Sequence, residues 1–548
     1  MNMQLNRILF SCAMLLCSVG ASLACTSLIA TPGATASGSS MVTYAADSHT
    51  LYGALASQPA ADHPKGAMRK VYDWDTGVYR GEIPEVAHTY ATVGNMNEHG
   101  LTIAESTFGG RPELEGSGTI DYGSLIYITL QRARTAREAI DVMTSLVRDY
   151  GYASEGESFS IADPNEVWIM EMIGKGKTDK GAVWVARRVP DGYICGHANH
   201  PRIHTFPLKD PETLYSPDVI SFARKQGYFS GKDKDFDFSR TYAITDNGAV
   251  RGCDARVWSY FRRFSSAEEM DRYTPWIMEA KGEPFPLWVK PSEKLSADDL
   301  KWMMRDHYEG TLLDMTKDIG AGAYDVPYRW RPMTFTVDSV EYVHERAIAT
   351  QQTGFSFVAD MNKNRHDAMK GVLWFGVDDA NTCVYVPVFN SNTVVPKSLD
   401  EKTADLLTLS WDAMFWVNNY VANQAYNRYS QMIPDIRRVQ KGLEDKYTAQ
   451  VAEAEKAVAS MDYEKARAYL NDLTVAAAEG TTADYKKLGD FLLVKFLDGN
   501  IKAEKDGVFE RTPEGMPARP TFGGYNDRYF RSIVDEAGDR LRLENPKY

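Results

Sequence analysis

The sequence CTSLIATPGATASGSSMVTYAAD occupies residues 25–47 and predicts a β-hairpin. Its first six residues are short, apolar and β-branched, as expected for a strand. The next eight are rich in Pro, Gly, Ala and Thr, which is typical of a turn, and the remainder returns as a second strand that ends at Asp47. Such a hairpin would hold Cys25, its first residue, in a fixed place and would bring Asp47 beside it.

The residues before this hairpin have the pattern of a secretory signal peptide. Arg7 is the only charged residue among the first 24, residues 8–19 form a short apolar run, and Ser22 and Ala24 supply small residues for signal peptidase. The run is too short to span a bilayer, and no later segment offers about 18 uncharged apolar residues. We therefore expect residues 1–24 to be a signal peptide. The protein would be exported, either to a periplasm or out of the cell, without stable membrane insertion.

Cleavage after Ala24 would make Cys25 the first residue of the mature protein, and two fates then compete for it. In a lipoprotein, the sulfur is modified with a diacylglyceryl group. In an N-terminal-nucleophile hydrolase, the thiol attacks an amide carbonyl and the α-amine of the same residue acts as the base. A lipoprotein signal normally has an apolar residue three positions before the cysteine, but Ser22 stands there, which favours the hydrolase.

The chemistry of an N-terminal cysteine suits hydrolysis near neutral pH. A thiol has an ordinary pKa of about 8.5 and an α-amine has one of about 8, so a proton passes between them with little driving force. The thiolate is a strong nucleophile, and an adjacent base is a recognised way of activating it. This reaction requires neither a metal nor another cofactor.

The hairpin resembles the opening of the dipeptidase A-type cysteine dipeptidases, which are N-terminal-nucleophile hydrolases related to penicillin V acylases and bile salt hydrolases. The resemblance rests on Cys25-Thr26-Ser27, on residues 34–39 and on Asp47, and it continues at lower specificity to roughly residue 400. It implies a four-layer αββα sandwich that hydrolyses dipeptides or short peptides. Many members have Arg where this chain has Tyr44, so the role of that Arg is not carried over.

The same resemblance implies the other residues of the site. Asp47 would hold the α-amine or position the substrate, and Asn199 would match the asparagine that stabilises the oxyanion. Asn97, in a segment similar to the Asn-Glu-x-Gly-Leu hairpin of the family, and Thr107 shortly after it would contact the substrate.

The periodicity of the remaining sequence indicates an α+β fold. Helices are expected at residues 122–132 and 135–150, and Gly151 would end the second of them. Strands are expected at residues 159–162, 167–173, 182–187, 333–337, 371–377 and 383–389. We assign residues 25–400 to a catalytic domain.

The composition changes after residue 400 to segments rich in Ala, Glu, Lys and Leu. Helices are expected at residues 406–429, 433–459, 461–478 and 483–497. No catalytic constellation is found in this part. We interpret residues 401–548 as a helical region that serves packing or subunit contact, and a homo-oligomer is left open.

Several other classes are disfavoured. The formal net charge of −13 and the absence of a basic stripe argue against a nucleic-acid partner. His197, His200 and His204 have spacing that could bind a metal on a helix, but Pro201 interrupts that helix, so no metal site is predicted. The sequence leaves open whether a disulfide joins two of Cys195, Cys253 and Cys383.

Two alternatives to a dipeptidase remain. The first is an acylase that cleaves N-acyl amides, as penicillin V acylases and bile salt hydrolases do. The second is a non-catalytic peptide-binding lipoprotein that is acylated at Cys25, and it leaves the family match after that residue unexplained.

Overall fold

The computed structural model describes residues 25–544, so the signal peptide predicted at residues 1–24 lies outside the described residues. Its centre consists of two antiparallel sheets, which gives the α+β class expected from the sequence. The seven-stranded sheet has this order: β16 (Trp288–Val289), β14 (Ile194–His197), β1 (Ser27–Ala30), β2 (Ser40–Asp47), β19 (Thr353–Met361), β20 (Gly371–Val377) and β21 (Val386–Phe389). The predicted hairpin is confirmed, because β1 pairs with β2 through Ile29 opposite Val42.

The eight-stranded sheet faces the first one, with β10 and β11 lying against β2. Its order is β15 (Thr213–Tyr215), β13 (Ala182–Arg188), β12 (Val167–Gly174), β11 (Gly156–Ala162), β10 (Thr102–Gly109), β9 (Met96–Asn97), β8 (Thr92–Val93) and β3 (Ser57–Gln58). Every residue of β1, β2, β11, β12, β19 and β20 is buried. Strands buried on both faces require a covering layer on each outer side of the pair of sheets.

Helices α1 (Tyr122–Leu130) and α2 (Ala136–Tyr150) cover the outer face of the eight-stranded sheet, as the sequence predicts. The side chain of Thr135 caps α2 by accepting a hydrogen bond from the Glu138 amide. Gly151 ends this helix at a positive φ of 77°, a backbone conformation that favours glycine.

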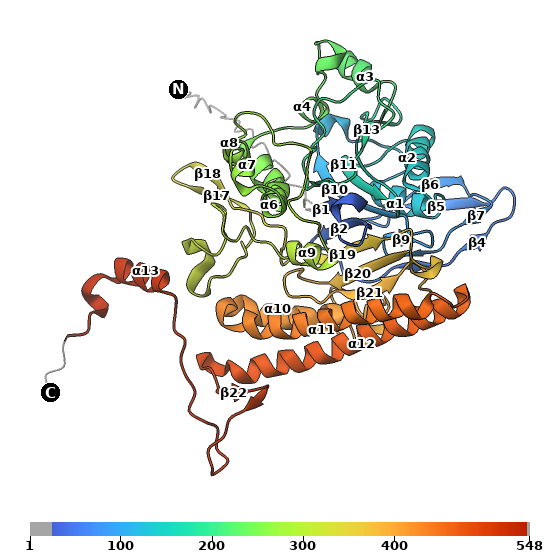
Figure 1. Cartoon of the computed structure of the whole chain (residues 1–548). Helices are drawn as coiled ribbons and strands as arrows, with labels where there is room; N and C mark the ends of the chain where they lie inside the picture. Colours follow the sequence, from blue (N-terminus) through green and yellow to red (C-terminus); the bar gives the residue numbers. More distant parts are fainter. Residues whose placement is uncertain (1–24, 545–548) are drawn as a thin grey trace, which may run out of the picture.

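Three long helices cover the outer face of the seven-stranded sheet at β20 and β21 (Figure 1). They are α10 (Met414–Asn427), α11 (Tyr429–Val458) and α12 (Tyr463–Lys495). The same sheet is also contacted by α6 (Ala255–Phe264) at β14 and by α9 (Ala297–Met303) at β19.

Two expectations about these helices were wrong. The predicted helices at 461–478 and 483–497 form a single helix, α12, which continues through Gly480 because Thr481 bonds the Tyr447 hydroxyl of α11 at 2.7 Å. The residues from 406 to 413 are not helical. They turn before α10, where the Trp416 indole donates to the Asp405 carbonyl at 2.9 Å.

The remaining elements are short and lie around this frame. Further hairpins are β5–β6 (Met68–Tyr72, Tyr79–Pro84), β17–β18 (Thr334–Val337, Val340–Val343) and β22–β23 (Glu504–Lys505, Val508–Phe509). The first of these lies between β4 (Ala61–Asp62) and β7 (His88–Thr89), which pair with each other. The other helices are α3 (Val219–Lys225), α4 (Phe238–Tyr242), α5 (Asn247–Ala249), α7 (Ala267–Asp271), α8 (Thr274–Glu279) and α13 (Asp527–Ala537). Within residues 25–544, no helix is both long and apolar enough to cross a membrane.

Candidate active site

Cys25 lies two residues before β1 and contributes to the wall of a cavity of about 210 Å³. The backbone of Cys25 is held in place by two contacts. Its neighbour Thr26 forms a β-bridge with Ala45 of β2, and the Cys25 carbonyl accepts a hydrogen bond of 2.7 Å from Arg256. The cavity is lined by Cys25, Tyr44, Ala46, Asp47, Ser48, Thr50, Leu51, Trp74, Asp75, Asn95, Tyr122, Gly123, Ile126, Tyr127 and Phe355. The thiol is therefore both fixed in position and adjacent to a space that can receive a small molecule.

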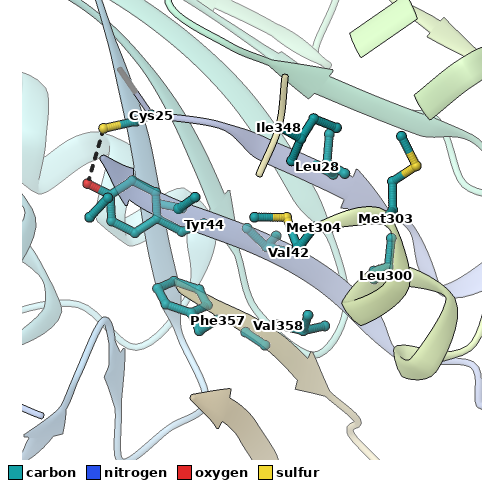
Figure 2. Packing of buried hydrophobic residues seen from close by; sticks show 14 of the residues in the cluster. Cys25, Leu28, Val42, Tyr44, Leu300, Met303, Met304, Ile348, Phe357 and Val358 are labelled. Atoms are coloured by element: carbon teal, nitrogen blue, oxygen red, sulfur yellow. Dashed lines mark hydrogen bonds between the residues drawn. The ribbon is translucent and has the colours of Figure 1, made fainter. Parts of the chain in front are cut away.

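Two side chains lie beside the Cys25 sulfur, and Figure 2 shows one of them, Tyr44, with its hydroxyl directed at the thiol. The Tyr44 hydroxyl lies 3.7 Å from Sγ, and Oε1 of Glu105 on β10 lies 3.3 Å from it. The Tyr44 hydroxyl also donates to the same Glu105 oxygen at 2.5 Å. Burial raises the pKa of the Cys25 thiol well above its ordinary value, and the nearby negative charges of Glu105 and Asp47 raise it further. Hydrogen bonds from the Asp47 backbone and Tyr44 lower the same pKa, but less.

Glu105 forms a carboxyl pair with Glu157 of β11, and both residues are fully buried. Thr107 donates to Glu157 Oε1 at 2.9 Å, whereas no donor among the described residues reaches Oε2 of either glutamate. Burial raises the pKa of Glu157 well above its ordinary range, and the charge of Glu105 adds to that rise. Two adjacent buried carboxyls cannot both ionise at low cost, so the pair retains a proton.

The structure places Asp47 in the same cavity wall as Cys25. Its carboxylate forms an ion pair with Arg346, whose Nη2 lies 2.6 Å from Oδ2, and Thr353 donates to Oδ1 at 2.6 Å. Asp47 is fully buried, so these partners compensate a charge that would otherwise be costly.

Asn199 does not line the cavity, and it is connected to Cys25 through one arginine. Arg256 lies just after a π-helical segment (Val250–Asp254). Its Nη2 donates to Asn199 Oδ1 at 2.8 Å, and its Nη1 donates to the Cys25 carbonyl. The Asn199 amide nitrogen donates to the Thr107 carbonyl at 2.6 Å. Asn199 also has a φ of +53°, and non-glycine residues held in this region often mark functional sites.

Thr107 and Asn97 do not line the cavity. The Thr107 hydroxyl donates to Glu157 and the Thr107 carbonyl accepts from Asn199, so Thr107 holds these two side chains in position. The Asn97 side chain is fully buried and bonds only backbone groups: its amide donates to the carbonyls of Leu130 and Ala133. Contact of these two residues with the substrate therefore stays a prediction, and in the structure their polar side-chain atoms are engaged within the fold.

The histidines considered for a metal site each have another partner. His197 is buried between Ser106 and Ser160, at 2.7 and 2.8 Å, and burial lowers its pKa to about 3. His200 bonds Asp254 at 2.9 Å. No group of three His, Cys, Asp or Glu side chains in residues 25–544 is arranged to hold a metal ion, and all four cysteines described there are free thiols.

Sequence reasoning missed Glu105, Glu157 and Arg256. A signal for the two acids was present, because each is an ionisable residue within a strand that is otherwise apolar or small, and such residues are almost never fully buried without a reason. Arg256 lies 231 residues after Cys25, and nothing in the local pattern connects the two.

A family model described as peptidase family C69 matches residues 11–442 of the chain. The chain therefore belongs to this family, and it is a peptide hydrolase of the cysteine type. The resemblance drawn from residues 25–47 is thereby confirmed.

Similar proteins carry names from the same class. A probable dipeptidase from Latilactobacillus sakei is 24% identical over 460 residues, which cover 79% of this chain and 88% of that protein. A probable dipeptidase from Salmonella dublin is 26% identical over 348 residues, covering 59% of this chain and 74% of that protein. A dipeptidase from Bifidobacterium longum is 24% identical over 325 residues, covering 57% of this chain and 55% of that protein.

Proposed function

We propose that this chain is an exported dipeptidase whose nucleophile is Cys25, exposed as the N-terminal residue when residues 1–24 are removed. The observation that carries the proposal is the position of the Cys25 thiol, which lines a small cavity at the start of a buried central strand. Membership of a peptidase family supplies the reaction class, and the names of the relatives favour dipeptides as substrates.

In the proposed acylation step, the α-amine of Cys25 takes the proton of the thiol, and Sγ forms a bond to the scissile carbonyl carbon. The resulting oxyanion is stabilised by hydrogen-bond donors, each of which can contribute about 3–4 kcal/mol. Asn199 is proposed to act here, and Arg256 orients it by bonding both Asn199 Oδ1 and the Cys25 carbonyl. The tetrahedral species collapses, the carbon–nitrogen bond breaks, and the α-ammonium returns its proton to the leaving amine.

Water then completes the cycle. It attacks the thioester carbonyl while the α-amine accepts its proton. The carbon–sulfur bond breaks, the thiol is regenerated, and the amino-terminal residue of the substrate is released. Asp47 is proposed to balance the positive charge that the α-amine carries between the two steps. Its partners Arg346 and Thr353 keep its carboxylate from rotating away.

The layers described above favour an N-terminal-nucleophile αββα sandwich as the fold. Two facing antiparallel sheets, with α1 and α2 on one side and α10, α11 and α12 on the other, have the order helix, sheet, sheet, helix. The helices after residue 400 then supply the outer helical layer of this sandwich, since α12 packs on β21.

The experiment that tests this proposal compares Cys25→Ala with the unmodified enzyme on a dipeptide such as Ala-Ala. Hydrolysis should fall to background while the folded structure, followed by circular dichroism, is retained. Cys383→Ala is the matched control, because it removes another fully buried thiol from the same sheet region and should retain activity. Turnover of Ala-Ala by Cys25→Ala at the normal rate would end the proposal.

The acylase alternative is tested with the same proteins. An enzyme that cleaves N-acyl amides and not Ala-Ala would be an acylase. A lipoprotein would carry a diacylglyceryl group on Cys25 and would hydrolyse neither substrate.

A further inference from the structure

The charged residues that line the Cys25 cavity are both acidic. They are Asp47 and Asp75, and no Lys, Arg or His of the described chain lines this cavity. Asp47 is compensated by Arg346. Asp75 has no cationic partner in the part of the chain that the structure describes, and its one polar side-chain contact is the Tyr122 hydroxyl, which donates to Oδ1 at 2.9 Å.

Further negative charge lies behind the cavity wall. The Glu105–Glu157 pair is fully buried, and no hydrogen-bond donor reaches Oε2 of either residue from the other described side chains. Burial raises the pKa of Tyr122 well above the ordinary value, and the nearby Glu105, Asp75 and Cys25 raise it further. The acidic groups and the thiol therefore surround one small space.

Asp75 is held at the mouth of this space by the tip of the β5–β6 hairpin. Its neighbour Trp74 stacks on Tyr127 of α1, with ring centroids 4.6 Å apart and an interplanar angle of 28°. Trp74 also packs directly on Gly123, where an added Cβ would lie 2.4 Å from the indole, so only glycine permits this contact. The hairpin tip is thus docked on α1, and it presents a carboxylate beside aromatic faces, a combination that suits a cationic group.

We propose that Asp75, with Trp74 and Tyr122 around it, forms the subsite that binds the free α-ammonium of a peptide substrate. This inference rests on the proposed function, because it assumes that Cys25 attacks the substrate. The α-ammonium nitrogen of a dipeptide is two bonds from the scissile carbonyl carbon, and it is the only cationic group common to all dipeptides. With that carbon against Sγ, the ammonium enters the acidic space, where charge-assisted hydrogen bonds are strong.

The subsite would select against N-acylated substrates. An acyl group in place of the ammonium would lose the charge-assisted hydrogen bond to Asp75 and would place apolar atoms against its carboxylate. The site is therefore specific for peptides with a free amino terminus.

The test uses two substrates with the same scissile amide, Ala-Ala and N-propionyl-alanine, which lacks only the ammonium. The unmodified enzyme should prefer Ala-Ala by a factor of about 100 or more in kcat/KM. Asp75→Asn should lower kcat/KM for Ala-Ala by about ten- to a hundred-fold, mainly through KM, and should leave the rate on N-propionyl-alanine unchanged or higher. Asp75→Glu should restore part of the preference.

The control variant is Glu82→Gln, which removes one negative charge from the exposed side of the same hairpin and should change neither rate. An Asp75→Asn enzyme with an unchanged preference for Ala-Ala would overturn the subsite. An unmodified enzyme that hydrolyses both substrates equally well would also overturn it while leaving the proposed function intact. Hydrolysis of neither substrate would contradict the proposed function itself.

Discussion

Two buried glutamates on opposite sides of the seven-stranded sheet differ in whether a cationic partner compensates their charge. Glu444 of α11 is nearly buried and fully compensated, because Arg305 bonds both of its oxygens at 2.5 and 3.1 Å and the Tyr385 amide donates at 3.0 Å. Glu105 is fully buried beside the Cys25 sulfur and has no cationic partner within the described residues. The first arrangement is what stability requires of a buried charge.

The second arrangement is destabilising in itself, and it is found where the chain is proposed to carry out chemistry. Uncompensated buried ionisable groups cluster at functional sites, because their perturbed pKa values and unpaired charges can act on a substrate. The helical layer therefore stabilises the protein, while the space between the sheets retains reactive and unpaired groups.

The largest effect is expected from removal of the compensated charge. Glu444→Ala leaves Arg305 buried without its partner, and the free energy of unfolding should fall by about 3–5 kcal/mol. Urea denaturation measures this loss, and Glu453→Ala on the exposed side of α11 is the control, with a change within about 0.5 kcal/mol. Equal stabilities for the two variants would show that the α11 contact does not anchor the helical layer.

A smaller effect is expected from Glu105→Gln, which keeps the shape of the side chain and removes its charge. A negative charge beside a thiol disfavours the thiolate and raises the thiol pKa, so its removal should lower the pKa of Cys25. The pH dependence of iodoacetamide labelling at Cys25 should therefore shift to lower pH. Glu171→Gln is the control, because this buried acid of β12 bonds the amides of Arg202 and Ile203 and does not contact Cys25. A labelling profile that is unchanged in Glu105→Gln, or that is shifted to higher pH, would mean that Glu105 carries no charge next to the thiol.

Much of the fold was predictable because local patterns agree with it. The β1–β2 hairpin, α1 with α2, and strand β20 follow directly from turn residues, helical spacing and apolar runs. The break predicted near Gly480 failed, because a contact of Thr481 with Tyr447 on another helix outweighs the weak helix propensity of glycine.

The site was predictable only where its residues lie within one local motif. Cys25 and Asp47 belong to the same hairpin, so its pairing brings both to one cavity wall. Arg256, Arg346 and Glu105 reach this place from other elements, through strand order and helix packing that no local pattern specifies. The partners of Asn97 and Thr107 were not predictable for the same reason, since distant backbone and side chains supply them.

Cys25 is proposed to act as a free N-terminal residue, and the mass of the N-terminal peptide of the active, purified enzyme decides whether it does. We expect a peptide that begins at an unmodified Cys25, whose thiol and α-amine are both available. An active enzyme that keeps residues before Cys25, or that carries a lipid on this cysteine, would contradict it.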